Sequence, residues 1–126
     1  VGIYGINPHL AHSAWYNIIK DTKHGCNVEV SEGGKVVYVE DVVQAIDLAI
    51  GNKEAAGKIY NLVDFYVDNM TIARMAKDIC ASKSNISGTP RQPINTIDNT
   101  QSWALGVRYA GTDGLKRYIQ ELIHRI

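Results

Sequence analysis

The side chains that could do chemistry by their type and spacing form two small groups. His9 and His12 are three residues apart, so a helix there would place both imidazoles on one face, as two ligands of a metal ion. No third ligand has a natural position, so the pair predicts no metal site. Glu40 and Asp41 are adjacent carboxylates that could act as an acid–base pair. Neighbouring strand residues point to opposite faces, and Asp41 suits a helix N-cap, so a structural role is favoured.

None of the short motifs that mark catalytic sites is present. The sequence lacks a glycine-rich phosphate loop, a G-x-S-x-G nucleophile turn, an H-E-x-x-H metal motif and a cysteine cluster. Cys26 and Cys80 are far apart in the sequence, and we expect two buried, reduced thiols of a cytoplasmic protein rather than a disulfide. His24 and His124 fall near predicted helix ends, where a cation is favourable. The residue types by themselves therefore predict no catalytic residue.

The composition excludes several classes of protein. The chain has 126 residues, of which 45% are apolar and 21% charged, and its 13 basic residues balance 13 acidic ones. A neutral balance gives no basic field for nucleic acid or anionic lipid. No apolar run approaches the roughly 20 residues of a membrane span, and no signal peptide is recognised. The length and the apolar content predict one folded domain, residues 1–126.

The first third of the chain is predicted to begin with a strand. Residues 1–4 form an apolar run ended by Gly5, and Asn7-Pro8 suits the start of a helix that continues to Gly25. Residues 28–30 and 36–39 are strand-like runs separated by Ser-Glu-Gly-Gly, which predicts a hairpin.

The most strongly marked helix is predicted to open at Asp41. Its side chain can cap the first amides, and Gln44 completes a capping-box-like pair. The helix is predicted to end at Gly51-Asn52. Its buried stripe is predicted to consist of Val42, Val43, Ile46, Ala49 and Ile50.

The remaining elements alternate in type. Residues 58–63 are predicted to form a strand, and a helix capped near Asp68 or Asn69 should bury Ile72, Ala76, Ile79 and Cys80. Residues 81–97 are polar, contain two prolines and should form the longest loop. Asp98 and Gln101 could cap a short helix that ends at Gly106. The last helix should begin near Thr112 and bury Leu115, Tyr118, Ile119, Leu122, Ile123 and Ile126. Strands interleaved with helices predict an α/β domain with a small sheet and flanking helices.

Four segments match motifs in a fixed order along nearly the whole chain. Residues 3–5 resemble a Y-G-(P) element, and residues 38–46 resemble a V-x-D-V-x-x-A-I segment. Residues 57–62 resemble a G-x-x-Y-N-[IL] strand. Residues 105–106 and 114–115 resemble a C-terminal L-G…G-L pattern. In this order and spacing the chain resembles the extended short-chain dehydrogenases/reductases, and within them the NAD-dependent epimerase/dehydratase group.

The resemblance covers only the C-terminal portion of such an enzyme. The family's N-terminal Rossmann half, which holds NAD or NADP with a glycine-rich turn, has no counterpart in residues 1–126, and neither does its catalytic Y-x-x-x-K pair. The resemblance therefore implies the substrate-binding part of an oxidoreductase or isomerase, inactive without the N-terminal Rossmann half. The chain starts with Val1 rather than Met, which also favours a fragment.

The resemblance also implies where cofactor and substrate would lie. The backbone of Val1 would be beside the nicotinamide, as the one cofactor neighbour in this chain. Gly2 takes the position of an Asn that contacts the substrate in many sugar-nucleotide members, and Asn7 and His9 follow it as further expected substrate-binding residues. Gly34 takes the position of an Arg that pairs with a diphosphate.

These departures leave the substrate open. Lys35 is next to Gly34, but its side chain should point to the opposite strand face, and a lysine has no bidentate fork. A nucleotide sugar, a smaller sugar, a sugar acid or another carbonyl or alcohol compound remain alternatives. A free-standing, non-catalytic binding domain of the same fold is the second hypothesis. An open strand edge near Val1 would also allow a homodimer.

Overall fold

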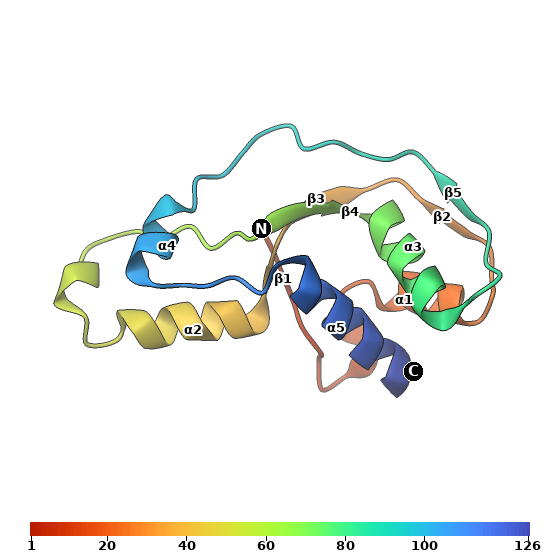
Figure 1. The fold of residues 1–126 in the computed structure, drawn as a ribbon, viewed down its shortest axis with the longest axis horizontal. Coiled ribbons are helices and arrows are strands. Elements are labelled where there is room, and N and C mark those ends of the chain that lie inside the picture. Colours follow the sequence, from red (N-terminus) through yellow and green to blue (C-terminus); the bar gives the residue numbers. More distant parts are fainter.

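A three-stranded sheet lies at the centre of the molecule. The computed structural model describes all of residues 1–126, and its central strands are β1 (Gly2–Tyr4), β3 (Gly33–Tyr38) and β4 (Phe65–Asp68), in the order β1-β3-β4. β1 runs parallel to β3, and β4 runs antiparallel to it (Figure 1). Because β3 is the middle strand, its residues Val36 and Val37 are buried. The expected α/β fold with a small sheet is confirmed.

A second, smaller sheet pairs β2 (Val28–Val30) in parallel with β5 (Ile86–Gly88). The predicted hairpin between residues 28–30 and 36–39 is therefore wrong. The chain passes from β2 into β3 without a turn (Figure 1). Gly33 is paired with Asp68, and the Asn69 amide donates to the Glu32 carbonyl at 2.7 Å. These contacts fix the segment that was expected to reverse direction.

Three helices pack on one face of the central sheet: α1 (Tyr16–Lys23), α3 (Asn69–Cys80) and α5 (Gly111–Arg125). The predicted cap of α3 is confirmed, since the Thr71 amide donates to Asp68 Oδ1 at 2.9 Å. The predicted buried face of α5 is also confirmed in its first four members. The core cluster that joins these helices to the sheet comprises Tyr4, Ile19, Val36, Val67, Ile72, Ala76, Leu115, Tyr118, Ile119 and Leu122.

The helix expected from Asn7-Pro8 is shorter than predicted and starts later. Only one turn of 3-10 helix, η1 (Leu10–His12), precedes α1. Asn7 is held in a loop, because its amide donates to Ser13 Oγ at 2.9 Å and its Oδ1 accepts the His9 amide at 2.9 Å. Local side-chain bonds of this kind compete with the helix for the same backbone groups.

A group of smaller elements lies beside this core. It contains α2 (Val39–Ala49), the 3-10 turn η2 (Lys53–Ala55) and α4 (Thr100–Leu105) (Figure 1). The strand predicted at residues 58–63 is wrong, because β3 pairs with residues 65–68 instead, and Ile59 is 84% exposed. Asn99 Nδ2 donates to the Val63 carbonyl at 2.7 Å, so side chains rather than a ladder fix this segment.

The predicted capping role of Asp41 is wrong. Helix α2 begins at Val39, and Asp41 lies inside its first turn, 4% exposed. Its Oδ2 accepts the Ala110 amide at 3.0 Å, while Gln44 Oε1 accepts the Arg108 amide at 2.6 Å. Both side chains therefore bind the segment before α5 rather than the amides of their own helix.

The predicted buried stripe of α2 is also wrong in its largest members. Val43, Ile46 and Ile50 are 60%, 54% and 74% exposed, whereas Asp41 and Ala45 form the buried face. The helix is amphipathic, as expected, but nothing in the chain covers its apolar side.

Two smaller expectations have mixed outcomes. Helix α4 ends at Gly106, as predicted, and Gly106 has a left-handed backbone conformation. The first turn of α4 is held by Asp98 Oδ1, which accepts the Thr100 amide at 2.9 Å, and not by Gln101. Both cysteines are free thiols, as expected. Cys26 is exposed, however, and Cys80 is only partly buried, because both lie at the ends of helices rather than in the core.

Candidate functional site

A hollow of about 270 Å³ opens beside the start of β1 and β3. The residues that line it come from β1, β3, the segment before α1 and the first residue of α3, and they include Gly2, Trp15, Gly33, Gly34, Lys35 and Asn69. The parallel register of β1 and β3 pairs Gly2 with Val36. The start of β1 therefore lies beside the first half of β3 at the same surface. The structure thus brings Gly2 together with Gly34 and Lys35, which the sequence singled out separately.

Glycine is required at only one of the three positions where it lines this hollow. A Cβ on Gly33 would meet the Tyr66 hydroxyl and lie 2.9 Å from Asp68 Cα, so the close approach of β4 requires glycine there. A Cβ on Gly34 would meet nothing within 4 Å, and one on Gly2 would make only ordinary contacts at 3.9 Å. Packing therefore does not impose glycine at positions 2 and 34, and neither position contributes a polar side chain to the wall.

Trp15 is the member of the site that sequence reasoning missed. Its backbone has a φ of 59°, which is unfavourable for a bulky residue. Its ring packs 5.5 Å from the Tyr4 ring and 6.1 Å from the Tyr118 ring, measured between centroids. Strained backbone of this kind is concentrated at functional sites. A tryptophan in a helix-like pattern carries no signal of this conformation, so the sequence analysis did not single it out.

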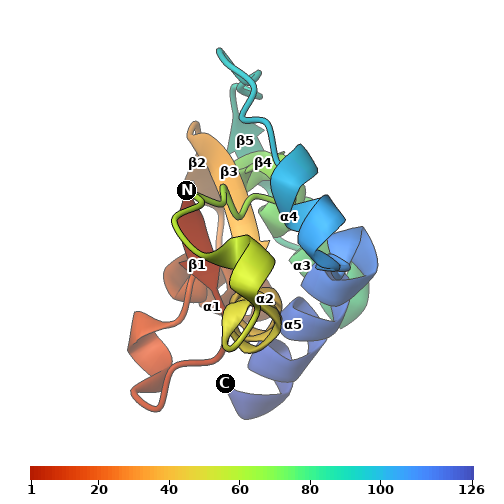
Figure 2. The same cartoon turned by 90° about the vertical axis from the view of Figure 1, so that its left-hand side faces the viewer.

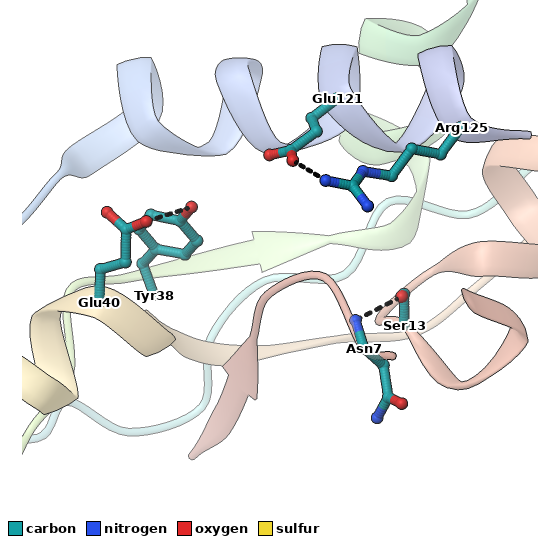
Figure 3. Close-up of polar contacts among 6 residues, drawn as sticks. All are labelled: Asn7, Ser13, Tyr38, Glu40, Glu121 and Arg125. Carbon is teal, nitrogen blue, oxygen red and sulfur yellow. Dashed lines mark hydrogen bonds and ion pairs between the residues drawn. The ribbon is translucent and has the colours of Figure 1, made fainter. Parts of the chain in front are cut away.

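The tyrosines around the hollow are not suited to proton transfer at neutral pH. Tyr4 is 1% exposed, and burial together with the nearby carboxylates of Asp64 and Asp41 raises its pKa far above the ordinary value. Its hydroxyl has no hydrogen-bond partner. Burial, and then Glu40, raises the pKa of Tyr38, whose hydroxyl donates to Glu40 Oε1 at 3.4 Å (Figure 3). These groups therefore stay protonated and serve as apolar surface with a polar tip.

The carboxyl groups of Asp41 and Asp64 hold the start of α5. Asp41 Oδ2 accepts the Ala110 amide, and Asp64 Oδ2 accepts the Gly111 amide at 2.7 Å. Burial raises the pKa of both carboxyls, and their mutual repulsion raises that of Asp64 further. Since each has a backbone donor and little exposure, they act in positioning α5.

The remaining expected site residues lie elsewhere. Val1 is 64% exposed at the beginning of β1, next to Gly2. Asn7 lines a separate open hollow with Arg125, where its amide bonds to Ser13 (Figure 3), and Arg125 forms a 2.8 Å ion pair with Glu121. His9 is exposed and outside the hollow. Its ring lies 5.8 Å from that of His12, and no group of three or more metal-ligating side chains occurs in the chain.

Two further hollows bear on the site. One of about 250 Å³ adjoins it at β4 and contains Arg91, which the sequence analysis left in the loop between Pro90 and Pro93. Arg91 is therefore a second cation, besides Lys35, near the β3–β4 pair. A hollow of about 700 Å³ lies between residues 52–60 and α4, and none of the expected substrate- or cofactor-binding residues lines it. No helix combines the length and apolar character needed to cross a membrane.

The comparisons with known proteins match the fold. No family model and no curated protein matches the sequence. Among solved structures, UDP-glucose 4-epimerase of Thermotoga maritima shares 17% identity and a TM-score of 0.70 over 98% of this chain. A dTDP-glucose 4,6-dehydratase of Streptomyces venezuelae, solved with NAD, shares 17% sequence identity and a TM-score of 0.66 over 98% of this chain. A Pseudomonas aeruginosa protein named RMD, solved with NADPH, shares 16% sequence identity and a TM-score of 0.72 over 99% of this chain.

The chain spans only part of the proteins that it matches. It covers 42% of the Thermotoga chain, 41% of the Streptomyces chain and 47% of the Pseudomonas chain. The fold is therefore that of a C-terminal portion of the extended short-chain dehydrogenase/reductase structure, as the resemblance of the motifs implied.

Proposed function

We propose that this chain is the substrate-binding C-terminal portion of an NAD- or NADP-dependent enzyme that acts on a sugar or nucleotide sugar, as an epimerase, a dehydratase or a reductase. The single observation that carries the proposal is the likeness of 98% of the chain to 42% of a UDP-glucose 4-epimerase. In this proposal the cofactor, the catalytic pair and the N-terminal Rossmann half belong to the remaining length, and the chain by itself is inactive.

The hollow beside β1 and β3 is the site at which we place the substrate. Trp15 and Gly2 offer a flat, partly apolar wall of the kind that sugar rings contact. The family resemblance implies that Val1, directly before β1, would lie beside the cofactor. The chain's own residues would bind and orient the substrate, and hydride transfer would depend on the nicotinamide held by the other half.

The alternative is a free-standing binding domain of the same fold. One observation favours it: the wall positions Gly2 and Gly34 carry no polar side chain although a side chain would fit. The two hypotheses differ in the protein segment encoded before Val1. A glycine-rich turn and a Y-x-x-x-K pair there would support the enzyme.

Tryptophan fluorescence can test the substrate site directly. The chain has two tryptophans, and Trp103 lies on α4, outside the hollow. In a Trp103→Phe variant, Trp15 is the sole reporter, and we expect UDP-glucose to change its emission. The matched Trp15→Phe variant, which reports only on Trp103, should not respond. A response confined to Trp103, or none in either variant, would contradict the proposed site.

A further inference from the structure

The segment between β1 and α1 carries Trp15 to the wall of the hollow beside β1. This segment extends away from the sheet as a loop before α1 begins, at the lower left of Figure 2. Ala14 and Trp15, its last two residues, both line the hollow and are half-buried. Trp15 has φ and ψ of 59° and 18°, a left-handed conformation that is unfavourable for a bulky side chain. Contacts from elsewhere in the fold must therefore hold it there.

Tyr118 of α5 makes a contact that reaches this loop. Its side chain is 1% exposed, and its hydroxyl donates to the Ala14 carbonyl at 2.7 Å. No backbone amide donates to that carbonyl, so the tyrosine is its donor in the fold. Burial raises the pKa of Tyr118 above its ordinary value, so the hydroxyl stays protonated at neutral pH. The Tyr118 ring also meets the Trp15 ring edge-on, with the two centroids 6.1 Å apart.

The hydrogen bond to Ala14 bears directly on the backbone of Trp15. The Ala14 carbonyl and the Trp15 amide nitrogen belong to one planar peptide group. Because the φ angle of Trp15 measures rotation relative to this plane, a fixed carbonyl restricts the directions in which the Trp15 side chain can leave the backbone. A local bond holds Ser13, whose Oγ accepts the Asn7 amide, whereas the peptide plane before Trp15 is held by Tyr118.

Tyr4 provides a comparison, because it packs against Trp15 without making such a bond. Its side chain is also 1% exposed, and its ring centroid lies 5.5 Å from that of Trp15 and 5.3 Å from that of Tyr118. Its hydroxyl has no hydrogen-bond partner. Both tyrosines therefore give Trp15 aromatic packing, and they differ in the hydrogen bond to Ala14.

We infer that Tyr118 is the positioning residue of Trp15: its hydroxyl fixes the peptide plane before Trp15 and so keeps Trp15 in the conformation in which it lines the hollow. Tyr118 itself does not line the hollow, so it acts through Trp15. The use of Trp15 toward a sugar rests on the proposed function, whereas the fixing of its conformation rests on these contacts alone. A substrate that packs on an ordered Trp15 loses no affinity to ordering the loop.

Fluorescence of Trp15 tests this role in the Trp103→Phe background, where it is the sole tryptophan. Tyr118→Phe removes the bonded hydroxyl and keeps the ring. The matched control is Tyr4→Phe, which removes a hydroxyl without a partner from an equally buried side chain. We expect Tyr118→Phe to increase the quenching of Trp15 by acrylamide, because an indole that is no longer fixed is reached more often from solvent. Tyr4→Phe should leave the quenching unchanged.

The affinity for UDP-glucose is the second measurement, in the same background. Tyr118→Phe should weaken binding by roughly two- to tenfold, the effect of one hydrogen bond. Its control is Tyr109→Phe, which removes a hydroxyl 2.7 Å from Ser102 Oγ, outside the hollow, and should leave the affinity unchanged. Circular dichroism checks that each variant keeps the parent fold.

The outcomes separate this role from the proposed function. Any result in which Tyr118→Phe does not increase the quenching more than Tyr4→Phe would overturn the role of Tyr118. A Tyr118→Phe chain that loses its helical signal would also overturn it, since the hydroxyl would then stabilise the whole fold and not Trp15 in particular. Increased quenching with no effect on UDP-glucose binding, or with no response to UDP-glucose in the parent background, would contradict the proposed site and leave the role of Tyr118 standing.

Discussion

Neighbouring glycines on β3 show how little a residue type reveals about its environment. Gly33 lies against the Tyr66 hydroxyl and the backbone of β4, whereas Gly34 faces open space. In the same way, Asp41 sits at a position suited to capping by sequence, but its carboxyl binds a backbone amide 69 residues away. The role of each residue depends on which distant segment the fold brings to it.

Replacing the two glycines separately should have opposite effects on stability. Gly33→Ala places a methyl group against Asp68 Cα at 2.9 Å and against the Tyr66 ring, so we expect a loss of about 1–3 kcal/mol in the free energy of unfolding. Gly34→Ala meets nothing and should be neutral or stabilising by roughly 0.5 kcal/mol. Urea denaturation of both variants measures this. Equal stability of the two would contradict the close approach of β4 to Gly33.

The Asp41 carboxyl should make the stability depend on pH. Burial raises its pKa in the folded chain above the usual 3.8, although the Ala110 amide opposes the shift. Between the unfolded-state pKa and the higher folded-state pKa of Asp41, the folded chain binds more protons than the unfolded chain. The contribution of Asp41 to the free energy of unfolding therefore falls as the pH rises through this range. Asp41→Asn keeps an acceptor for Ala110 and removes the charge. The variant should lose this part of the pH dependence in urea titrations at several pH values.

The exposed Asp47 on the same helix provides the control for that measurement. Asp47→Asn should leave the pH profile unchanged. If both variants alter the profile equally, the effect is one of net charge and not of the buried carboxyl.

Helices were predicted more reliably than strands at the scale of elements. The last helix and α3 have strong caps or long apolar faces, and these local features survive in any fold that buries the face. The strands are three to six residues long, and their partners are distant in sequence. The local sequence does not show which apolar segments pair with each other. The predicted hairpin and the predicted strand at residues 58–63 were wrong for this reason.

The cap of α3 is the local feature whose loss should matter most. Asp68 Oδ1 accepts both the amide and the hydroxyl of Thr71. Burial alone would raise the pKa of Asp68, but these hydrogen bonds lower it overall. Asp68→Ala should reduce the free energy of unfolding by roughly 0.5–2 kcal/mol. The equivalent change at Asp98, before the six-residue α4, should cost less, because α4 contributes little to the core. Thermal unfolding followed by circular dichroism compares the two.

On the scale of the whole molecule, the proposed site borders the core, since Tyr4, Val36 and Val67 belong to the core cluster and also line the hollow. The core joins α1, α3 and α5 to the central sheet, while α2, α4 and residues 50–63 lie beside it with few buried apolar residues. The sequence contains no glycine-rich phosphate loop for a dinucleotide, and neither Tyr4 nor Tyr38 is suited to proton transfer at neutral pH.

The chain alone should therefore bind neither NAD nor NADP tightly and should not turn over a sugar nucleotide. Isothermal titration calorimetry with each dinucleotide is the measurement, and UDP-glucose in the same buffer is the comparison. A dissociation constant on the order of low micromolar for NAD would contradict the assignment of cofactor binding to another half.

The sequence by itself determined the α/β class, helices α3 and α5 with part of their buried faces, the cap at Asp68 and the order of motifs that implied the fold. These features depend on periodicity and on hydrogen bonds within a few residues, which a linear pattern contains. The tertiary structure decided that β1 pairs with β3, that Asp41 and Asp64 hold the start of α5, that Trp15 adopts a left-handed backbone and that α2 leaves its apolar stripe open. Each of these requires contact between segments distant along the chain, or the lack of one, and the free energy of such contacts is set by the whole fold.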